Sequence, residues 1–331
     1  MGGAAITGAA GFLGAHLTRG FEARGVQALP LVRSLQDRSP SGARELGEVL
    51  ATPSLLEGLD VVVHAAATRY RRGIDGPTYR ASNIELLERT LRAAAEARVR
   101  RFVLVSSVGV YGFPSRLPAT EEHPYAPRTL QAATKVEVEM RARRVARDLG
   151  LELVIVRPTT VYGPGDGNRT LERIASAIRA GTYRVVGPGE NPLHHLHVDD
   201  LVEGVWLAAT RVEAADDHFI LAGPETITLE GLSALVARAV GRPLARARVP
   251  SVLARAVATV FDVAAHRGVA YAESEPPVNH EKLDGMTLPL WFDVSKARRR
   301  LGFAPRVGYE EGVVRTLRGE WPALARTGAG T

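Results

Sequence analysis

Three polar residues of this chain have the types and spacing to act on a carbonyl group: Ser107, Gln131 and Lys135. The serine follows an apolar run with strand character, and the other two stand four residues apart in a stretch with a helical pattern. A serine hydroxyl can donate a hydrogen bond to a carbonyl, and a lysine supplies a positive charge. A glutamine amide, however, cannot donate and regain a proton at neutral pH. The acid for such a reaction must therefore come from another group.

A glycine-rich turn near the N-terminus predicts that the chain binds a dinucleotide. The strand-like run Ala4–Ile6 leads into Gly8, Gly11 and Gly14, and an amphipathic stretch from Ala15 to Arg24 follows. The first glycine permits a tight turn, the second lets the backbone approach a pyrophosphate, and the third allows close packing of the helix. A purely structural turn is the alternative, but a strand, glycine turn and helix in this order favour a nucleotide site.

Five further blocks occur in a fixed order along the chain: Asp60–Ala67, Val103–Gly112, Val154–Asp166, His197–Asp200 and Phe292–Pro305. With the glycine turn, they resemble the extended short-chain dehydrogenase/reductase family, the NAD-dependent epimerase/dehydratase superfamily. The resemblance implies an α/β fold, a Rossmann-like doubly wound parallel sheet with a smaller interleaved C-terminal substrate lobe. We expect the dinucleotide-binding lobe at residues 1–162, with returning segments near 196–222, and a mainly substrate-binding lobe at 163–331.

The resemblance also gives roles to the three polar residues. In this family a strand serine orients the carbonyl, a lysine binds the nicotinamide ribose, and a tyrosine transfers the proton. Ser107 matches the serine and Lys135 the lysine, but Gln131 stands in the position of the tyrosine. Tyr111 or Tyr125, carried by loops, could still reach the substrate and replace the missing phenol. We otherwise expect a catalytic set of Ser107, Gln131 and Lys135 without a tyrosine.

The end of the second strand favours NADP(H) over NAD(H). The acidic residue that would bind a ribose 2′-hydroxyl is missing there, and Val32 and Arg33 stand in its place. Arg33 and Ser34 can bind a 2′-phosphate, although Arg33 could instead stack on the adenine of NAD. Glu48 matches the family's acidic residue near the adenine amine. The remaining coenzyme residues implied by the resemblance are Gly8, Gly11, Phe12, Leu13, Gly14, Ala65, Ala66, Ala67, Ser106, Lys135, Pro158 and Thr160.

Val108, Gly109 and Val161, which lie in the matching blocks, are expected to contact the substrate. For His194 and His195 two roles stay open, a contact with the substrate or packing within the protein. Dehydratases of the family carry Thr-Asp-Glu where this chain has Ser107-Val108-Gly109, so dehydration is disfavoured. Leu193 stands where epimerases hold an arginine for a nucleotide-sugar diphosphate, and an apolar residue cannot pair with that group. We therefore expect a small-molecule ketone, apolar or aromatic, such as that of a polyketide.

The loss of the tyrosine leaves reduction energetically possible. A general acid contributes about 10²- to 10⁴-fold, whereas positioning alone can supply roughly 7 to 11 kcal/mol. We expect an NADPH-dependent ketoreductase in which the proton comes from a substrate hydroxyl or from ordered water. An NADP(H)-binding redox sensor without turnover, and a nucleotide-sugar epimerase-type isomerase, are the alternatives.

Composition adds a few expectations. The 331 residues carry a net charge of +6 and include no cysteine, and the arginines are spread without interleaved aromatic residues. Arg255 and Asp262 interrupt the apolar run Val252–Ala265, which we expect to be a helix that lines a pocket of the second lobe. We therefore predict a cytoplasmic monomer or homodimer, with no nucleic acid, membrane or metal partner.

Overall fold

The computed structural model describes residues 1–36, 39–68, 74–266 and 279–320. Within these ranges seven strands form one parallel sheet in the order β11-β6-β5-β4-β1-β2-β3. The strands are β1 (Gly3–Thr7), β2 (Gln27–Val32), β3 (Arg44–Glu45), β4 (Val61–His64), β5 (Arg101–Val105), β6 (Glu152–Pro158) and β11 (His218–Leu221). The predicted doubly wound parallel sheet is confirmed.

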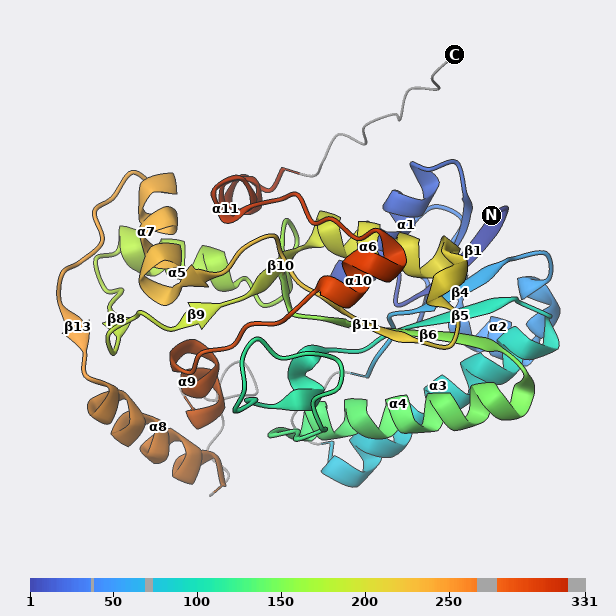
Figure 1. Ribbon diagram of the computed structural model, residues 1–331, viewed down its shortest axis with the longest axis horizontal. Coiled ribbons are helices and arrows are strands. Elements are labelled where there is room, and N and C mark those ends of the chain that lie inside the picture. The colour runs from blue at the N-terminus through green and yellow to red at the C-terminus, as the bar shows by residue number, and fades with distance from the viewer. Residues whose placement is uncertain (37–38, 69–73, 267–278, 321–331) are drawn as a thin grey trace, which may run out of the picture.

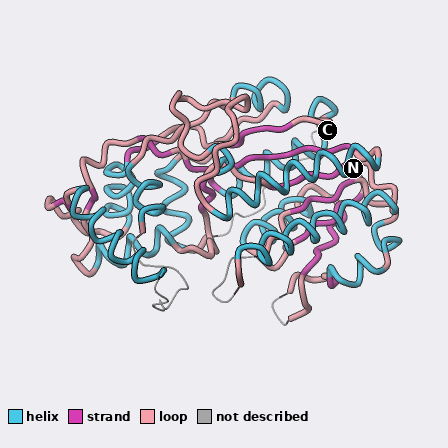
Figure 2. The backbone as a smooth tube through the Cα atoms, turned by 90° about the horizontal axis from the view of Figure 1, so that it is seen from below, coloured by secondary structure: helices cyan, strands magenta, loops and turns pink. Residues whose placement is uncertain are grey.

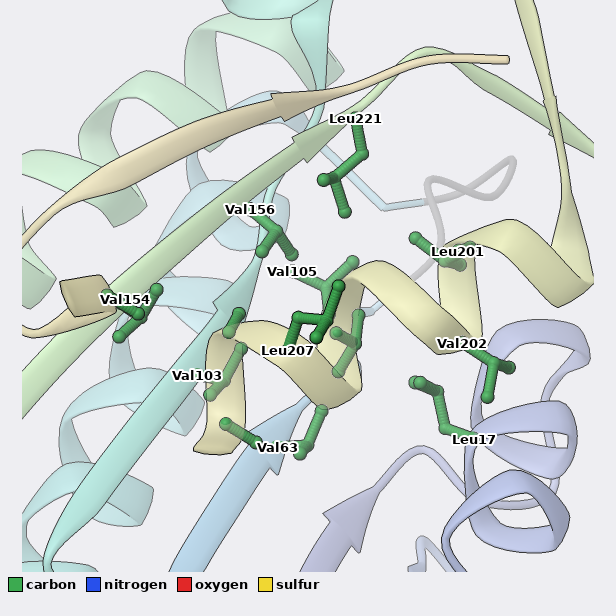
Figure 3. Close-up of a cluster of buried hydrophobic side chains, with 14 of the residues drawn as sticks. Leu17, Val63, Val103, Val105, Val154, Val156, Leu201, Val202, Leu207 and Leu221 are labelled. Carbon is green, nitrogen blue, oxygen red and sulfur yellow. The ribbon is translucent and has the colours of Figure 1, made fainter. Parts of the chain in front are cut away.

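Helices cover both faces of the sheet, and this explains why its central strands are almost wholly apolar. One face is covered by α1 (Phe12–Glu22), α6 (Val198–Thr210) and α10 (Ser295–Leu301); the other is covered by α2 (Leu46–Ala51), α3 (Gly76–Glu96) and α4 (Leu130–Leu149) (Figure 1). Figure 3 shows Leu201 and Leu207 of α6 pointing toward Val105 and its neighbours on the sheet.

The two long helices α3 and α4 have recognisable capping residues. Asp75 caps α3 by accepting the N–H of Thr78. Thr129 caps α4 in the same way, through the N–H of Ala132, and Gly150 ends that helix in the left-handed conformation. These signals fix the register of α4, and with it the side chains at positions 131, 135 and 139.

A smaller second lobe lies beside the sheet lobe (Figure 2). Its helices are α5 (Thr170–Arg179), α7 (Leu229–Ala239), α8 (Ser251–His266), α9 (His280–Thr287) and α11 (Tyr309–Arg318). Short strand pairs accompany them: β7 (Thr160–Tyr162) with β10 (His195–His197), β9 (Pro192–Leu193) with β12 (Ile227–Thr228), and β8 (Val185–Val186) with β13 (Arg248–Val249). Single 3₁₀ turns, η1 (Pro53–Leu56), η2 (Val108–Tyr111) and η3 (Val212–Ala214), complete the described elements.

The chain passes between the two lobes more than once. The segments expected to return near 196–222 supply α6 and the edge strand β11 of the sheet lobe. A later return was not expected: α10 and Phe303 pack into the same core, and Asp200 of α6 accepts the N–H groups of Arg306 (2.8 Å) and Val307 (3.0 Å). The short length of α10 gives it only a weak periodic signal in the sequence.

The apolar run 252–265 lies within a helix, α8, as predicted. Its valine and leucine side chains are exposed, and α8 packs on its neighbours through the small residues Ala254 and Ala258. No residue of α8 lines the cleft at the edge of the sheet or the small cavity beside that cleft.

Candidate active site

A cleft of about 1030 Å³ lies where the carboxyl ends of the strands meet. Five strand ends contribute to its wall: Gly8 after β1, residues 31–34 at the end of β2, 65–68 after β4, 106–107 after β5 and 158–160 at the end of β6. In doubly wound sheets this edge is where ligands bind. The fold thus gathers into one cleft residues that lie up to 160 positions apart in the sequence.

The glycine turn forms a cradle that has no room for side chains. A Cβ atom on Gly14 would lie 2.1 Å from the carbonyl oxygen of Gly8, and one on Gly8 would lie 3.0 Å from the backbone of Ala66. Gly8 also has φ +74°, which favours glycine. Gly11 provides no side chain to cap α1, so the first-turn N–H groups remain available to an anion.

The residues of the cradle fit a nicotinamide dinucleotide. Phe12, Leu13 and Gly14 of the first turn line the cleft, as do Ala65, Ala66, Ala67, Ser106, Pro158 and Thr160, all predicted from the sequence. Thr159, a lining residue that was not predicted, has a buried hydroxyl oxygen without a hydrogen-bond partner in the described protein. An unpartnered buried hydroxyl at a cleft wall is available to a bound ligand.

Arg33 and Ser34 lie at one end of the cleft, with Gln36, which the sequence did not point to. Arg33 is exposed and forms no ion pair within the part of the chain that the structure describes. Glu48 does not line the cleft, because its carboxylate pairs with Arg44 at 2.9 Å on the surface. Three other residues of α2, Leu46, Gly47 and Leu50, do line it. One helix face carries positions 46, 47 and 50, and position 48 is turned away from it.

At the other end, Ser107 lines the cleft and its Oγ accepts the N–H of Gly109 at 3.1 Å. Lys135 reaches the end of β5 from α4, and its Nζ donates to the carbonyl oxygen of Val105 at 2.9 Å. Burial lowers the pKa of Lys135, while the charge of Glu139 one turn further along α4 acts to raise it. The serine and the lysine are therefore both held at the end of the same strand.

A second, small cavity of about 20 Å³ adjoins the cleft, with which it shares Ala66 and Ala67. Its other lining residues are His64, Tyr79, Asn83, Leu104, Gln131, Thr134, Lys135 and Val138. Gln131 and Lys135 thus both line this cavity, and neither lines the main cleft. A polar space of this size can hold one water molecule.

His64 is a polar wall residue of this cavity that the sequence analysis missed. The Thr7 hydroxyl oxygen accepts the N–H of Ala66 at 3.0 Å and lies 3.2 Å from His64 Nδ1, within hydrogen-bonding distance. Burial, with a smaller contribution from the charge of Lys135, lowers the pKa of His64 to about 3, so the ring is neutral. The sequence did carry a signal for this residue, because His64 directly follows the apolar strand run Val61–Val63 and so stands at the carboxyl end of a strand.

The two tyrosines considered as substitutes for the missing phenol lie in a buried network. Arg157 donates to the phenol oxygens of Tyr111 and Tyr125 and to the Glu139 carboxylate, and Tyr125 donates to Glu139 at 2.7 Å. Burial would raise the pKa of Glu139, but the hydrogen bonds and charge of Arg157 outweigh it and lower that pKa. Neither Tyr111 nor Tyr125 lines the cleft or the small cavity. Among the described tyrosines, Tyr79 alone lines either space.

Of the predicted substrate residues, Val161 lines the cleft, whereas Val108 and Gly109 do not. His194 and His195 are also absent from its wall. The Nδ1 atom of His194 accepts the N–H of Phe292 at 3.2 Å and its Nε2 donates to the carbonyl oxygen of Gly223 at 3.0 Å, so both nitrogens bond within the protein.

Asp166, Gly167 and Asn168, which the sequence did not single out, also line the cleft, as Val161 does.

In the described ranges no group of three or more histidine, aspartate or glutamate residues could hold a metal ion.

A family model described as the NAD dependent epimerase/dehydratase family matches residues 4–222. The chain belongs to this family. A 4-hydroxy-2-methyl-3-oxo-4-farnesyl-3,4-dihydroquinoline-1-oxide ketoreductase of Stigmatella aurantiaca is 32% identical over 93% of this chain and 93% of its own length. A 2-alkyl-3-oxoalkanoate reductase of Stenotrophomonas maltophilia is 28% identical over 94% of this chain and 97% of its own length. The chain is thus an oxidoreductase/epimerase-type enzyme of a nicotinamide-dinucleotide-dependent family.

Solved structures agree with the fold. The structure of gox2253 matches with a TM-score of 0.76 and 28% identity, over 96% of this chain and 97% of the other. MoeE5 in complex with UDP-glucuronic acid and NAD matches with a TM-score of 0.72 over 96% and 98% of the two chains, and at 23% identity it supports the fold alone. None of the described helices has the length and apolar character required to cross a membrane.

Proposed function

We propose that this protein is a cytoplasmic NADPH-dependent ketoreductase that reduces an apolar or aromatic ketone without a catalytic tyrosine. The observation that carries the proposal is that Gln131 and Lys135 both line a polar cavity of the size of one water molecule, while Arg157 hydrogen-bonds Tyr111 and Tyr125. The ketoreductase and reductase names of two relatives support the reaction class.

The chain's own residues have separable tasks in this reaction. The bound coenzyme would supply the hydride. Ser107 hydrogen-bonds the substrate carbonyl, and Lys135 holds the nicotinamide ribose while its remaining N–H groups hydrogen-bond a water in the small cavity. Gln131 orients that water through its amide without giving up a proton. The alcohol oxygen takes its proton from this water or from a substrate hydroxyl, and the donor regains its proton from solvent.

The second lobe supports an apolar substrate rather than a nucleotide sugar. Leu193 is buried, and it lies opposite Ile227 where β9 pairs with β12. A buried leucine cannot pair with a diphosphate, which weighs against the epimerase alternative. In lacking this tyrosine, the chain resembles an angucyclinone ketoreductase of simocyclinone biosynthesis. This likeness supports a role in antibiotic biosynthesis.

The proton source is tested by installing the missing phenol. Gln131→Tyr should not raise NADPH-dependent turnover of an aromatic ketone, because the phenol would displace the water that Gln131 orients and the site does not rely on a side-chain acid at this position. A gain of about 10² or more, the range of a general acid, would contradict the proposal.

A second variant and a product assay separate this reaction from its competitors. Tyr79→Phe should keep turnover within a few-fold; a loss of about 10² or more would identify that phenol as the acid. Binding of NADPH without turnover over a broad panel of ketones would favour the redox sensor, and product formation without net coenzyme consumption would favour the isomerase.

The coenzyme preference is tested at Arg33. Arg33→Ala should weaken NADPH binding by about 10- to 100-fold, the value of a hydrogen bond to a charged group, and leave NADH binding nearly unchanged. Fluorescence titration with both coenzymes measures this difference. Arg89, which lines the cleft on α3, provides the matched control, since Arg89→Ala should change both affinities alike. Equal losses for both coenzymes in Arg33→Ala would show that the arginine stacks on adenine instead.

A further inference from the structure

His64 is the last residue of β4, and it is a polar residue in a position that faces a hydrophobic core. Successive residues of a strand face opposite sides of the sheet. Val61 and Val63 pack on the side of α1 and α6, whereas Val62 packs on the side of α3 and α4. His64 therefore faces α3 and α4, where its ring stacks on Phe102 with the centroids 5.6 Å apart. Only 3% of the residue is exposed, and a polar side chain so deeply buried requires hydrogen-bond partners.

One imidazole nitrogen of His64 has a partner in the protein, and the other does not. Nδ1 lies 3.2 Å from the hydroxyl oxygen of Thr7, within hydrogen-bonding distance. Nε2, on the other side of the ring, has no hydrogen-bond partner among the described residues. In either tautomer this nitrogen offers one hydrogen bond, as a donor or as an acceptor. His64 also lines the small cavity of about 20 Å³, and a water molecule in that cavity can take this bond.

Two other side chains of the cavity wall can bind the same water. Lys135 Nζ carries three N–H donors, and in the described ranges the carbonyl oxygen of Val105 accepts one of them. The Gln131 amide, one turn earlier on α4, forms no hydrogen bond to a described residue, and it can both donate and accept. Together with His64 they make three polar partners, which is the usual number for a buried water molecule.

Two further polar residues of the wall, Asn83 and Thr134, already bond to the backbone. The Asn83 amide accepts the N–H of Thr68 at 2.9 Å and donates to the carbonyl oxygen of Tyr79 at 2.8 Å. The Thr134 hydroxyl donates to the carbonyl oxygen of Leu130 at 2.8 Å. Asn83 and Thr134 therefore add little to the binding of a water, and the phenol of Tyr79 is tested by the Tyr79→Phe variant.

His64 can hold a water molecule but cannot replace it as the acid. Burial, with a smaller contribution from the charge of Lys135, lowers the pKa of His64 to about 3, so the imidazole is neutral at physiological pH. A neutral ring has no acidic proton to transfer in this range. Any effect of His64 on the reaction is therefore exerted through the molecule that it binds.

We propose that His64 is a positioning residue whose Nε2 holds a water molecule in the small cavity, together with Gln131 and Lys135. The presence of this water does not depend on the reaction, whereas its use as a proton donor rests on the proposed function. In that reaction the water gives its proton to the alcohol oxygen as the hydride reaches the carbonyl carbon, and it regains a proton from solvent.

A crystal structure of the full-length protein tests the water site without any ketone. One ordered water should lie within about 3.2 Å of His64 Nε2, of the Gln131 amide and of Lys135 Nζ. His64→Phe keeps an aromatic ring against Phe102 and removes both nitrogens, so this variant should lose the water. An empty cavity in wild type, or the same water in His64→Phe, would overturn the proposal.

A matched pair of amide variants separates the two sides of the ring. The amide in His64→Gln reaches about as far as Nε2, whereas the amide in His64→Asn reaches about as far as Nδ1. With an aromatic ketone that the protein reduces, His64→Asn should lower kcat by about 3- to 10-fold, the value of one hydrogen bond, and leave the KM for NADPH unchanged. His64→Gln should stay within about twofold of wild type. A purely structural bond between His64 and Thr7 predicts the reverse order.

The control is His218→Asn, which removes an imidazole from β11 of the sheet lobe and should leave kcat unchanged. Equal losses of kcat in His64→Gln and His64→Asn, or a wild-type kcat in His64→Asn, would overturn the role of His64. If the water is present but no ketone is reduced, the proposed function fails and the water site stands. If ketones are reduced but the cavity is empty, this inference fails and the reduction stands.

Discussion

Two neighbouring turns of α4 differ in how fully their polar groups are satisfied. At the turn of Glu139, both carboxylate oxygens accept hydrogen bonds from Arg157, and Tyr125 adds another. At the turn of Lys135 and Gln131, the lysine has one acceptor among the described residues, the carbonyl oxygen of Val105, and both side chains border a small cavity.

The difference separates a structural polar cluster from a chemical one on the same helix. A saturated network has no spare donor or acceptor for a ligand, and it fixes the packing of α4 on β6. An unsaturated pair beside a cavity can exchange bonds with water or substrate. Hence a tyrosine in this protein is not a candidate acid merely because it lies near the active region: Tyr111 and Tyr125 belong to the saturated turn.

The largest effect is expected from breaking the saturated turn. Glu139→Leu leaves Arg157 buried without its counterion, and should lower the free energy of unfolding by about 3–5 kcal/mol. Glu137→Leu on the same helix removes a half-exposed pair with Arg80 and should cost less than about 1 kcal/mol. Urea unfolding of both variants measures the contrast; equal losses would show that the buried network is not structural.

A smaller effect is expected from changing Lys135, in the turn of α4 whose polar groups border the small cavity. Lys135→Met should reduce kcat/KM by about 10- to 100-fold, corresponding to one hydrogen bond from a charged group, and leave the unfolding midpoint close to that of wild type. Lys296→Met, which removes an ion pair with Asp217 on the sheet lobe, is the control and should affect stability rather than kcat/KM. Wild-type turnover in Lys135→Met would remove the lysine from the site.

The smallest effect concerns pH and sharpens the contrast further. Because burial lowers the pKa of Lys135, its positive charge is present at low pH and is lost as the pH rises through a value below 10.5. NADPH affinity should therefore fall on the alkaline side by up to about tenfold before ordinary lysines titrate. Lys135→Arg, which stays charged, should bind with an affinity that is flat up to about pH 10.5. A wild-type affinity that is equally flat would mean that the ammonium does not contact the coenzyme.

The sheet lobe was predictable from sequence because its signals are local. Apolar runs such as Val61–Val63 give the strands, and the glycine turn gives the cradle, so the residues at strand ends could be assigned to one cleft. Neighbours along the chain carry this information.

Contacts between distant segments were not predictable. His194 looked available to a substrate, but its two nitrogens bond to backbone groups 29 and 98 positions away. Glu48 is a local case: the helix phase of α2, which the sequence pattern did not show, turns it toward Arg44, four positions earlier, and away from the cleft. The exposed valines of α8 show the same limit, since an amphipathic pattern indicates which residues share one side of a helix and leaves open what lies against that side.

The late return of α10 has a consequence for biosynthesis. Ala297, Leu301 and Phe303 complete a core that also contains Ala4 and Ile6, more than 290 positions earlier in the sequence. The nucleotide half cannot close its hydrophobic interior until these late residues have emerged from the ribosome. Nascent chains stalled at any point before residue 295 should therefore be sensitive to protease. For the same reason, two fragments divided at residue 162 should not fold independently.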